Sequence, residues 1–419
     1  MRARAAVGRR GGDRAAWSWA LYDWANSAFA TTVMAGFFPV FFKEYWNAGV
    51  AVTESTFRLG VANSAASLAV AVAAPILGAV ADAGGHRKRF LVIFAALGIG
   101  STAALAGVGQ GEWVLAASLY LTGTVGFMAA NVFYDALLPG VAPPGRAHRV
   151  SAMGYAFGYL GGGLLFSLNV AMTLWPGAFG LSGPAQAVRL SFVTVAVWWA
   201  LFSIPLVRWV PEGGGETVPR AGREGLRRLL GTLRALGEHR QVFGFLLAYW
   251  LYIDGVDTIV RMAVDYGMSI GLEPRHLIAA LLLTQFVGFP AALVYGRIGE
   301  RVGAKRAVLA GLAVYLGVTL WARHMQTPAE FFGLAVVIGL VQGGVQALSR
   351  SLYSHLVPAG RSAEFFGFYN LTGKFAAVLG PVLMGGVAVL TGNPRDSVLA
   401  VGVLIVAGGL LLLRVPGGR

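Results

Sequence analysis

Cysteine is missing from all 419 residues of the chain, which excludes disulfide bonds, thiolate metal sites and cysteine nucleophiles. Charged residues are also scarce, at 12% of the chain against about 25% in a typical soluble domain. Hydrophobic residues, by contrast, make up 56% of the sequence. A chain this apolar and this poor in charge is predicted to be a multi-pass membrane protein.

Signatures of catalysis and nucleotide binding are equally sparse. The six histidines lie in breaks between apolar stretches or near the ends of those stretches, without metal-ligand spacing: His86, His148, His239, His276, His324 and His355. Without cysteine or an H-E-x-x-H sequence, a membrane-embedded enzyme is the weaker alternative, so we predict no catalytic residue, no metal site and no cofactor. There is also no nucleotide-binding loop, so any driving energy is expected from a gradient.

Apolar stretches separated by short, turn-rich breaks recur along the whole chain. A helix needs about 20 apolar residues to cross a bilayer of roughly 30 Å. Twelve spans are therefore predicted, at 16–42, 58–82, 90–109, 113–138, 149–173, 190–208, 241–267, 276–298, 305–322, 329–356, 363–390 and 397–414. The basic segment 1–16 resembles the start of a signal peptide, but the apolar stretch behind it is too long, which predicts an uncleaved first span.

The formal net charge of +14 follows the predicted topology. If the N-terminus is cytoplasmic, 24 lysine and arginine residues fall on the cytoplasmic side of the membrane and six on the other side. The positive-inside rule then places both termini in the cytoplasm. The basic charge is therefore a topology signal, and no nucleic-acid partner is expected.

The longest break divides the chain into two sets of six spans. It begins with a glycine-rich linker and continues with leucines on one helical face beside arginines, at 226–236. This pattern predicts a cationic helix on the membrane surface, with a partner-binding helix as the alternative. The predicted organisation is a six-helix bundle at 1–208, a cytoplasmic linker at 209–240 and a second six-helix bundle at 241–419. Similar short sequences recur 218 or 219 residues apart, which indicates a duplicated unit.

The strongest recurring motif is a loop after the second and the eighth predicted span. Residues 296–306 read G-R-I-G-E-R-V-G-A-K-R, and residues 78–88 read G-A-V-A-D-A-G-G-H-R-K. The second copy fits the loop motif of the major facilitator superfamily at every fixed position, whereas the first departs at Ala83. The resemblance implies the all-α, twelve-helix fold of that superfamily and a gating latch. The alternative is that the basic residues only set topology. The predicted gating residues are Gly78, Asp82, Arg87, Lys88, Gly296, Glu300, Arg301, Gly303, Lys305 and Arg306.

A narrower resemblance runs through most of the spans. It is carried by Y-D-W-A-N-S-A-F at 22–29, F-Y-D-A-L-L-P at 133–139, G-G-V-Q-A-L-S-R-S at 343–351 and E-F-F-G at 364–367. These segments resemble the vacuole-effluxer-like family related to autophagy, whose eukaryotic members are associated with amino-acid efflux from the vacuole. The resemblance implies an amino acid or a similar solute, although kinship of fold does not fix a ligand.

The first span carries a polar stripe within its apolar sequence. Asp23, Asn26, Ser27 and Ala30 are spaced to share one helical face. A carboxylate at this depth is disfavoured in lipid, so the stripe is expected to face protein or a water-filled cavity. In the fifth span, three glycines at a spacing of four residues predict close helix packing: Gly154, Gly158 and Gly162.

Further polar side chains within the spans complete the inventory of a transport cavity. The predicted cavity residues are Tyr22, Asp23, Asn26, Asp135, Tyr252, Asp254, Asp257, Arg261, Gln342, Gln346, Arg350, Asn370 and Lys374. Alternatively, these charges form structural pairs: Asp23 with Lys374, Asp135 with Arg350, and Asp257 with Arg261. Four acids face three bases, so one carboxylate is left over as a candidate proton carrier, and Asp254 is the candidate favoured by its lack of a basic neighbour at helical spacing.

The pattern as a whole predicts a secondary active transporter. It would move a small polar solute, such as an amino acid, by alternating access with proton coupling, and passive transport stays an alternative. A non-transporting membrane sensor or scaffold is the alternative from another class. The expected partners are the solute, protons and the lipid bilayer, and the chain is expected to be a monomer in the cytoplasmic membrane of the cell.

Overall fold

The chain is described by a computed structural model that covers residues 2–50, 58, 62, 65–66, 68–70, 73, 76–82, 84–143, 145–212, 231, 240–269, 272–358, 361–391 and 394–416. The secondary structure within these residues is helical. The predicted surface helix at 226–236 lies outside them apart from residue 231, as does most of the predicted span at 58–82.

The N-terminal bundle begins with a long helix in which α-helical and π-helical segments alternate. Its elements are α1 (Arg2–Ala28), the π-helical segment η1 (Phe29–Phe37), α2 (Phe38–Phe41), the π-helical segment η2 (Phe42–Trp46), α4 (Arg87–Leu105), α5 (Trp113–Val141), α6 (Ala147–Leu174), the short 3₁₀ turn η3 (Pro176–Phe179) and α7 (Pro184–Trp209). The C-terminal bundle comprises α9 (Arg240–Ser269), α10 (Pro274–Val302), α11 (Ala304–His324), α12 (Pro328–Leu356), α13 (Ser362–Thr391) and α14 (Pro394–Arg414).

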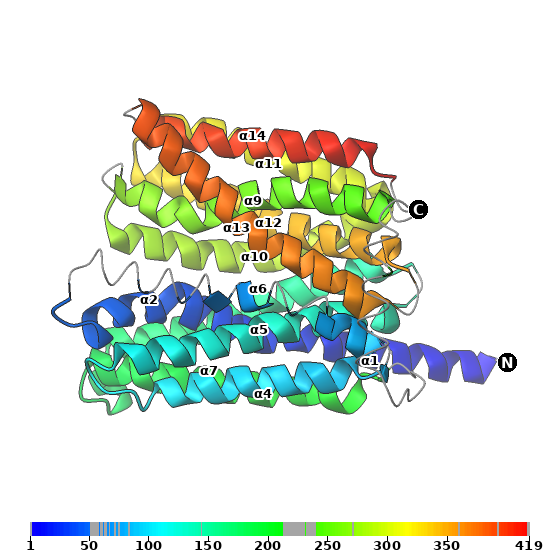
Figure 1. Ribbon diagram of the computed structural model, residues 1–419, viewed down its shortest axis with the longest axis horizontal. Coiled ribbons are helices and arrows are strands. Elements are labelled where there is room, and N and C mark those ends of the chain that lie inside the picture. The colour runs from blue at the N-terminus through cyan, green and yellow to red at the C-terminus, as the bar shows by residue number, and fades with distance from the viewer. Residues whose placement is uncertain are drawn as a thin grey trace.

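The long helices run side by side along the longest axis of the molecule (Figure 1). The blue-to-green N-terminal bundle and the green-to-red C-terminal bundle lie next to each other, and α6 packs against α10 between them. Both chain termini lie at the same end of the molecule, which we call the terminal end (Figure 1). The loop that joins α6 to α7 lies at the opposite end (Figure 1).

Ten described helical segments are long and apolar enough to cross a membrane. The predicted first span lies inside one of them, Asp13–Trp46, which is 34 residues long because helical turns continue past residue 42. The predicted span at 363–390 coincides with α13. An all-helical membrane fold is therefore confirmed, and the count of twelve spans stays a prediction.

The glycine stripe of α6 packs directly against the polar stripe of α1. A Cβ on Gly158 would lie 2.6 Å from Ser27 Oγ, and one on Gly162 would lie 2.7 Å from Thr31 Oγ1. Real Cβ atoms do not approach other atoms this closely, so the two backbones can meet here because the side chains are absent. The predicted close packing is confirmed, and it presents α1 to the centre of the molecule.

Each copy of the loop motif places a lysine against the end of a helix, although the two lysines occupy neighbouring positions of the motif. Lys88 Nζ donates to Val207 O at 3.2 Å and Val210 O at 3.0 Å, at the end of α7. Lys305 Nζ donates to the last carbonyls of α14 and the residue beyond it, at 2.8 and 2.6 Å. Each lysine satisfies carbonyls that a helix end leaves without intrahelical partners. The shared geometry supports the duplicated unit predicted from sequence.

Candidate functional site: a polar cavity between two bundles

A central cavity of about 360 Å³ lies between the two bundles. Its lining includes, from the N-terminal bundle, Asp23, Asn26, Ser27, Ala30, Thr31, Asn131, Tyr134, Asp135, Tyr155, Gly158 and Tyr159, and from the C-terminal bundle, Tyr249, Asp257, Gln285, Gln342, Gln346, Arg350, Tyr369 and Asn370. Both bundles therefore contribute carboxylate, amide and phenol groups to one space. A polar cavity at the interface of two helical units suits a small polar ligand.

Eight of the thirteen predicted cavity residues line this space: Asp23, Asn26, Asp135, Asp257, Gln342, Gln346, Arg350 and Asn370. The whole polar stripe of α1 faces it, as the helical spacing predicts. The side chains of Arg261 and Lys374 lie outside the described part of the structure.

The other three predicted residues lie behind the cavity wall. Tyr22 is fully buried, with its ring 5.1 Å from that of Tyr134. Tyr252 is also buried, and its hydroxyl lies 2.7 Å from Ser349 Oγ within the C-terminal bundle. Asp254 accepts a hydrogen bond from the backbone N–H of Gly380 at 2.9 Å. Its carboxylate thus ties α9 to α13, in place of the predicted position in the cavity.

Arg350 is the most connected side chain of the cavity. It comes from α12, is 3% exposed, and makes its polar contacts with the N-terminal bundle. Its Nη1 lies 3.1 Å from Asp135 Oδ1, and its Nη2 lies 3.4 Å from Asp23 Oδ2. Its Nε and Nη2 donate to the hydroxyl and the carbonyl of Ser151, both at 2.9 Å. One guanidinium therefore joins α12 to α1, α5 and α6.

Neighbouring groups fix both partners of this guanidinium. Tyr134 donates its hydroxyl proton to Asp23 Oδ2 at 2.9 Å, and Asn370 Nδ2 donates to Asp135 Oδ2 at 3.2 Å. The guanidinium carbon also lies 4.3 Å from the ring centre of Tyr155, within the range of a cation–π contact. The predicted pair of Asp135 and Arg350 is present, and Asp23 shares the same arginine.

Sequence reasoning missed several residues of the cavity wall: Asn131, Tyr134, Tyr155, Tyr159, Tyr249 and Gln285. A signal was present for two of them, because Tyr155 and Tyr159 flank Gly158 at a spacing of four residues. A signal was also present for Asn131, because it lies four residues before the predicted cavity residue Asp135 on the same helical face. Its amide oxygen accepts from Asn26 Nδ2 at 2.6 Å, a contact between residues 105 positions apart.

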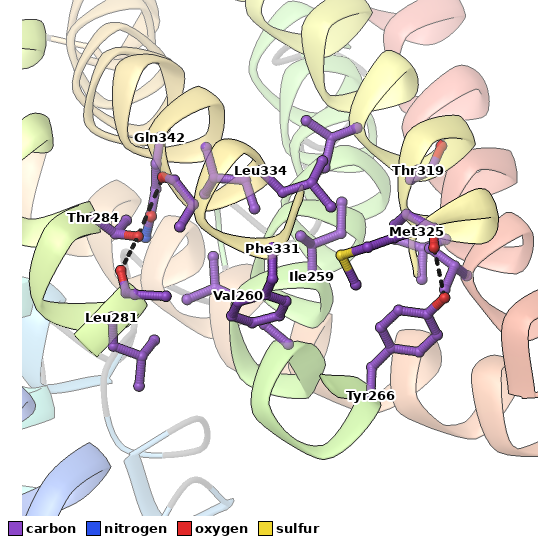
Figure 2. A pocket seen from close by; sticks show the side chains of 18 of the residues that line it. Ile259, Val260, Tyr266, Leu281, Thr284, Thr319, Met325, Phe331, Leu334 and Gln342 are labelled. Carbon is purple, nitrogen blue, oxygen red and sulfur yellow. Dashed lines mark hydrogen bonds between the residues drawn. The ribbon is translucent and has the colours of Figure 1, made fainter. Parts of the chain in front are cut away.

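A second, apolar cavity of about 80 Å³ lies inside the C-terminal bundle (Figure 2). Ile259, Phe331 and Leu334 point into it, and Gln342 lines both this cavity and the central one. Tyr266 donates its hydroxyl proton to Ala322 O at 2.7 Å, as the dashed line in Figure 2 marks. Most of its wall is apolar and this phenol is bonded to the backbone, so the described lining carries no charged group that would orient a polar solute.

The first predicted gating loop clamps the beginning of α13. Asp82 Oδ2 accepts from the backbone N–H of Glu364 at 2.9 Å, and Asp82 Oδ1 pairs with Arg87 Nε at 2.5 Å. A carboxylate is favoured at a helix N-terminus, where the backbone dipoles leave partial positive charge. A Cβ on Gly78 would lie 2.3 Å from Ala363 O, so only glycine permits this approach.

The second gating loop packs on α6 without an equivalent clamp. A Cβ on Gly296 would lie 2.7 Å from that of Ala152, which brings α10 against α6. Gly303 separates α10 from α11 with a φ of +93°. Glu300, unlike Asp82, is exposed, and Arg301 and Arg306 are exposed beside it. The two copies therefore share a fold but differ in their acidic contact.

Hydrogen bonds and ring contacts between the bundles gather at the terminal end. The ring centroids of His148 in α6 and His355 in α12 lie 5.2 Å apart, and His148 Nδ1 lies 2.6 Å from Ser351 Oγ. Ser362 at the start of α13 donates to Ala136 O at 2.9 Å. Together with Asp82 and Arg350, these contacts close the terminal end below the cavity.

Two helical bundles that line a polar cavity, together with 39% identity to an MFS-type transporter, define the class of the protein: a transporter of the major facilitator superfamily. Solved structures share the fold. The proton:xylose symporter XylE, bound to 6-bromo-6-deoxy-D-glucose, aligns with a TM-score of 0.70 at 14% identity, over 97% of this chain and 95% of that one. The human organic anion transporter MFSD10 aligns with a TM-score of 0.71 at 15% identity, over 96% and 99%.

Within that class, the chain belongs to the family described as vacuole effluxer Atg22 like, whose model matches residues 12–147 and 142–419. It is 39% identical over 402 residues to an uncharacterized MFS-type transporter, YxiO, of Bacillus subtilis, and the match covers 95% of this chain and 94% of that protein. Autophagy-related protein 22 of Yarrowia lipolytica is 27% identical over 305 residues, which cover 65% of this chain and 51% of the fungal protein.

Proposed function

We propose that the chain is a secondary active transporter that moves a small polar solute, such as an amino acid, through the central cavity by alternating access. The observation that carries the proposal is the position of Arg350. It projects from one bundle and bonds to three helices of the other at the base of a polar cavity. The closed terminal end therefore depends on contacts that must break when the bundles part there.

The chemistry of the cavity supports a solute with both donor and acceptor groups. Among the described side chains that line it, three are carboxylates and one is a guanidinium, beside amides and phenols. A zwitterion would find an anionic partner for its ammonium group in Asp257 and phenol rings at Tyr155 and Tyr159. Each phenol carries a hydroxyl group at the edge of an apolar ring, and such groups fix the orientation of a solute in a pocket.

Proton coupling follows from the shared guanidinium. Two carboxylates, Asp23 and Asp135, contact Arg350 at once. Protonation of one of them removes a negative charge and leaves guanidinium N–H groups for the carboxylate of a solute. Binding of the proton and binding of the solute would then favour each other, because protonation frees the guanidinium N–H groups that the carboxylate of the solute contacts. We propose these two acids as the proton-carrying groups.

The remaining assignments complete the proposal. The divisions are a first bundle at 1–208, a linker at 209–240 and a second bundle at 241–419. With the terminal end in the cytoplasm, the basic residues obey the positive-inside rule, and the described state is closed toward the cytoplasm. The transporter would act as a monomer in the cytoplasmic membrane.

Uptake into proteoliposomes tests the proposal. A screen of amino acids, peptides, sugars and organic anions first identifies the compounds that raise the thermal unfolding midpoint. The amino acids among these compounds are then used as radiolabelled probes. Uptake is measured with and without an imposed pH gradient. We expect the gradient to accelerate uptake, and Asp135→Asn to abolish that acceleration, since the amide cannot take up a proton at neutral pH.

Asp396→Asn is the matched control, because this acid pairs with Arg323 at the opposite end, outside the cavity wall. It should retain full gradient-driven uptake. Gradient-independent flux, with Asp23→Asn and Asp135→Asn both fully active, would refute proton coupling.

A further inference from the structure

A separate hollow of about 240 Å³ lies at the terminal end, between the middle of α1 and the beginning of α6. Its lining includes two arginines, one acid, one tryptophan and two apolar side chains: Arg146, Arg149, Asp13, Trp17, Val150 and Met153. None of these residues lines the central cavity. We call this space the α1–α6 hollow.

Among the described residues, the two arginines of the α1–α6 hollow together form one long, exposed ion pair with a carboxylate. Arg146 Nη1 lies 3.7 Å from Asp13 Oδ1, and both side chains are more than half exposed. No carboxylate of the described residues forms an ion pair with Arg149, which is also exposed. Exposed ion pairs at this distance contribute little to stability. The lining therefore presents one net positive charge and guanidinium donors that remain available.

The depth of the α1–α6 hollow matches the headgroup layer of a bilayer. The candidate span of α6 begins at Ala147, between the two arginines in the sequence. Trp17 is 54% exposed, with its ring centroid 5.2 Å from that of Phe157. Tryptophan at the end of a span is typical of the membrane interface. Val150 and Met153 continue an apolar wall below the basic rim.

We propose that the α1–α6 hollow binds the phosphodiester headgroup of a membrane phospholipid. Arg149 and Arg146 would hold the phosphate oxygens, since the planar guanidinium donates two parallel hydrogen bonds to phosphate. Trp17 and Met153 would contact the glycerol and the first carbons of the acyl chains. The carboxylate of Asp13 would repel the second negative charge of a phosphate monoester. A phosphodiester carries only one negative charge and is therefore favoured. Basic pockets between helices at this depth are suited to lipid headgroups.

Native mass spectrometry of the detergent-solubilised full chain tests this site. The probes are dioctanoyl phosphatidylglycerol, dioctanoylglycerol and inorganic phosphate, each titrated separately. The variant is Arg146→Gln with Arg149→Gln. The matched control is Arg208→Gln, which removes an exposed arginine from the last turn of α7 at the same end. Equal thermal unfolding midpoints establish that all three proteins are folded.

We expect one phosphatidylglycerol per chain, bound at least about tenfold more weakly by the double variant and equally well by the control, as the loss of charge-assisted bonds implies. Dioctanoylglycerol and inorganic phosphate should form no stoichiometric complex at the same concentration. Equal lipid binding by the double variant would overturn the proposal. So would equal binding of dioctanoylglycerol, which lacks the phosphate, or of inorganic phosphate, which would indicate a site for free anions.

Discussion

Replacement of Arg350 by glutamine should move the transporter toward a state that is open at the terminal end. In the closed state the guanidinium is buried and contacts Asp23, Asp135 and Ser151 across the two bundles. Glutamine cannot reach all of these partners and carries no charge. Two carboxylates would then share a buried site with no counter-ion among the described side chains, whereas water would hydrate them once the terminal end opens.

The expected shift is large. Removing one partner of a buried ion pair costs about 3–5 kcal/mol, because the remaining charge is left uncompensated. The contacts with Arg350 exist only while the bundles touch, so most of this cost falls on the closed state. A shift of about 3 kcal/mol changes the ratio of two states by roughly 100-fold. Arg350→Lys keeps the charge but loses the two-pronged geometry, so an intermediate shift is expected.

Cysteine labelling measures this equilibrium, because the natural chain has no cysteine. The reporter is Ser362→Cys, at a buried position whose hydroxyl bonds to Ala136 O across the bundles. Its rate of alkylation should rise strongly with Arg350→Gln. A second reporter, Ser203→Cys, is buried within α7 and detects general unfolding. The Arg350→Gln and Asp135→Asn double variant should be less open than Arg350→Gln alone.

Unchanged alkylation at position 362 in Arg350→Gln would refute the reasoning. Equal increases at positions 362 and 203 would also refute it, since they would indicate loss of the fold instead of separation of the bundles.

The remaining predictions concern the packing that positions the cavity and the gate. Asp82→Asn should raise alkylation at position 362 about tenfold, because the charge at the start of α13 is lost and such interactions contribute about 1–2 kcal/mol when partly buried; an unchanged rate would show that the clamp is not part of the gate. Gly78→Leu should raise it further, since the new side chain would meet Ala363 O and prevent closure; a rate below that of Asp82→Asn would contradict this. Gly158→Val should reduce the free energy of unfolding by about 1–3 kcal/mol and so lower the thermal unfolding midpoint. Gly177→Val should leave the midpoint unchanged, because no atom lies within 4 Å of the position of its Cβ.

The sequence predicts those features that depend on local spacing. A helix fixes the angle between residues three and four positions apart, so the stripe of Asp23, Asn26 and Ser27 could be assigned to one face. The glycine spacing in α6 predicts close packing for the same reason.

Features that depend on distant parts of the chain could not be predicted in this way. Asp254 and Asp257 are three residues apart, yet one bonds to the backbone of α13 and the other lines the cavity. Their roles differ because Gly380, 126 positions further on, presents its N–H to one of them. The choice of Arg350 as a shared partner for Asp23 and Asp135 also depends on how three helices meet, which spacing within one helix does not encode.

The central claim is that the two ends of the cavity open in alternation, and electron–electron distance measurements between spin labels test it most directly. One labelled pair, Gly140→Cys with Ser354→Cys, spans the bundles at the terminal end, and the other, Ala48→Cys with Ala329→Cys, spans them at the opposite end. We predict that Arg350→Gln lengthens the first distance and shortens the second. If both distances stay unchanged, or if both increase together, the result would contradict the account.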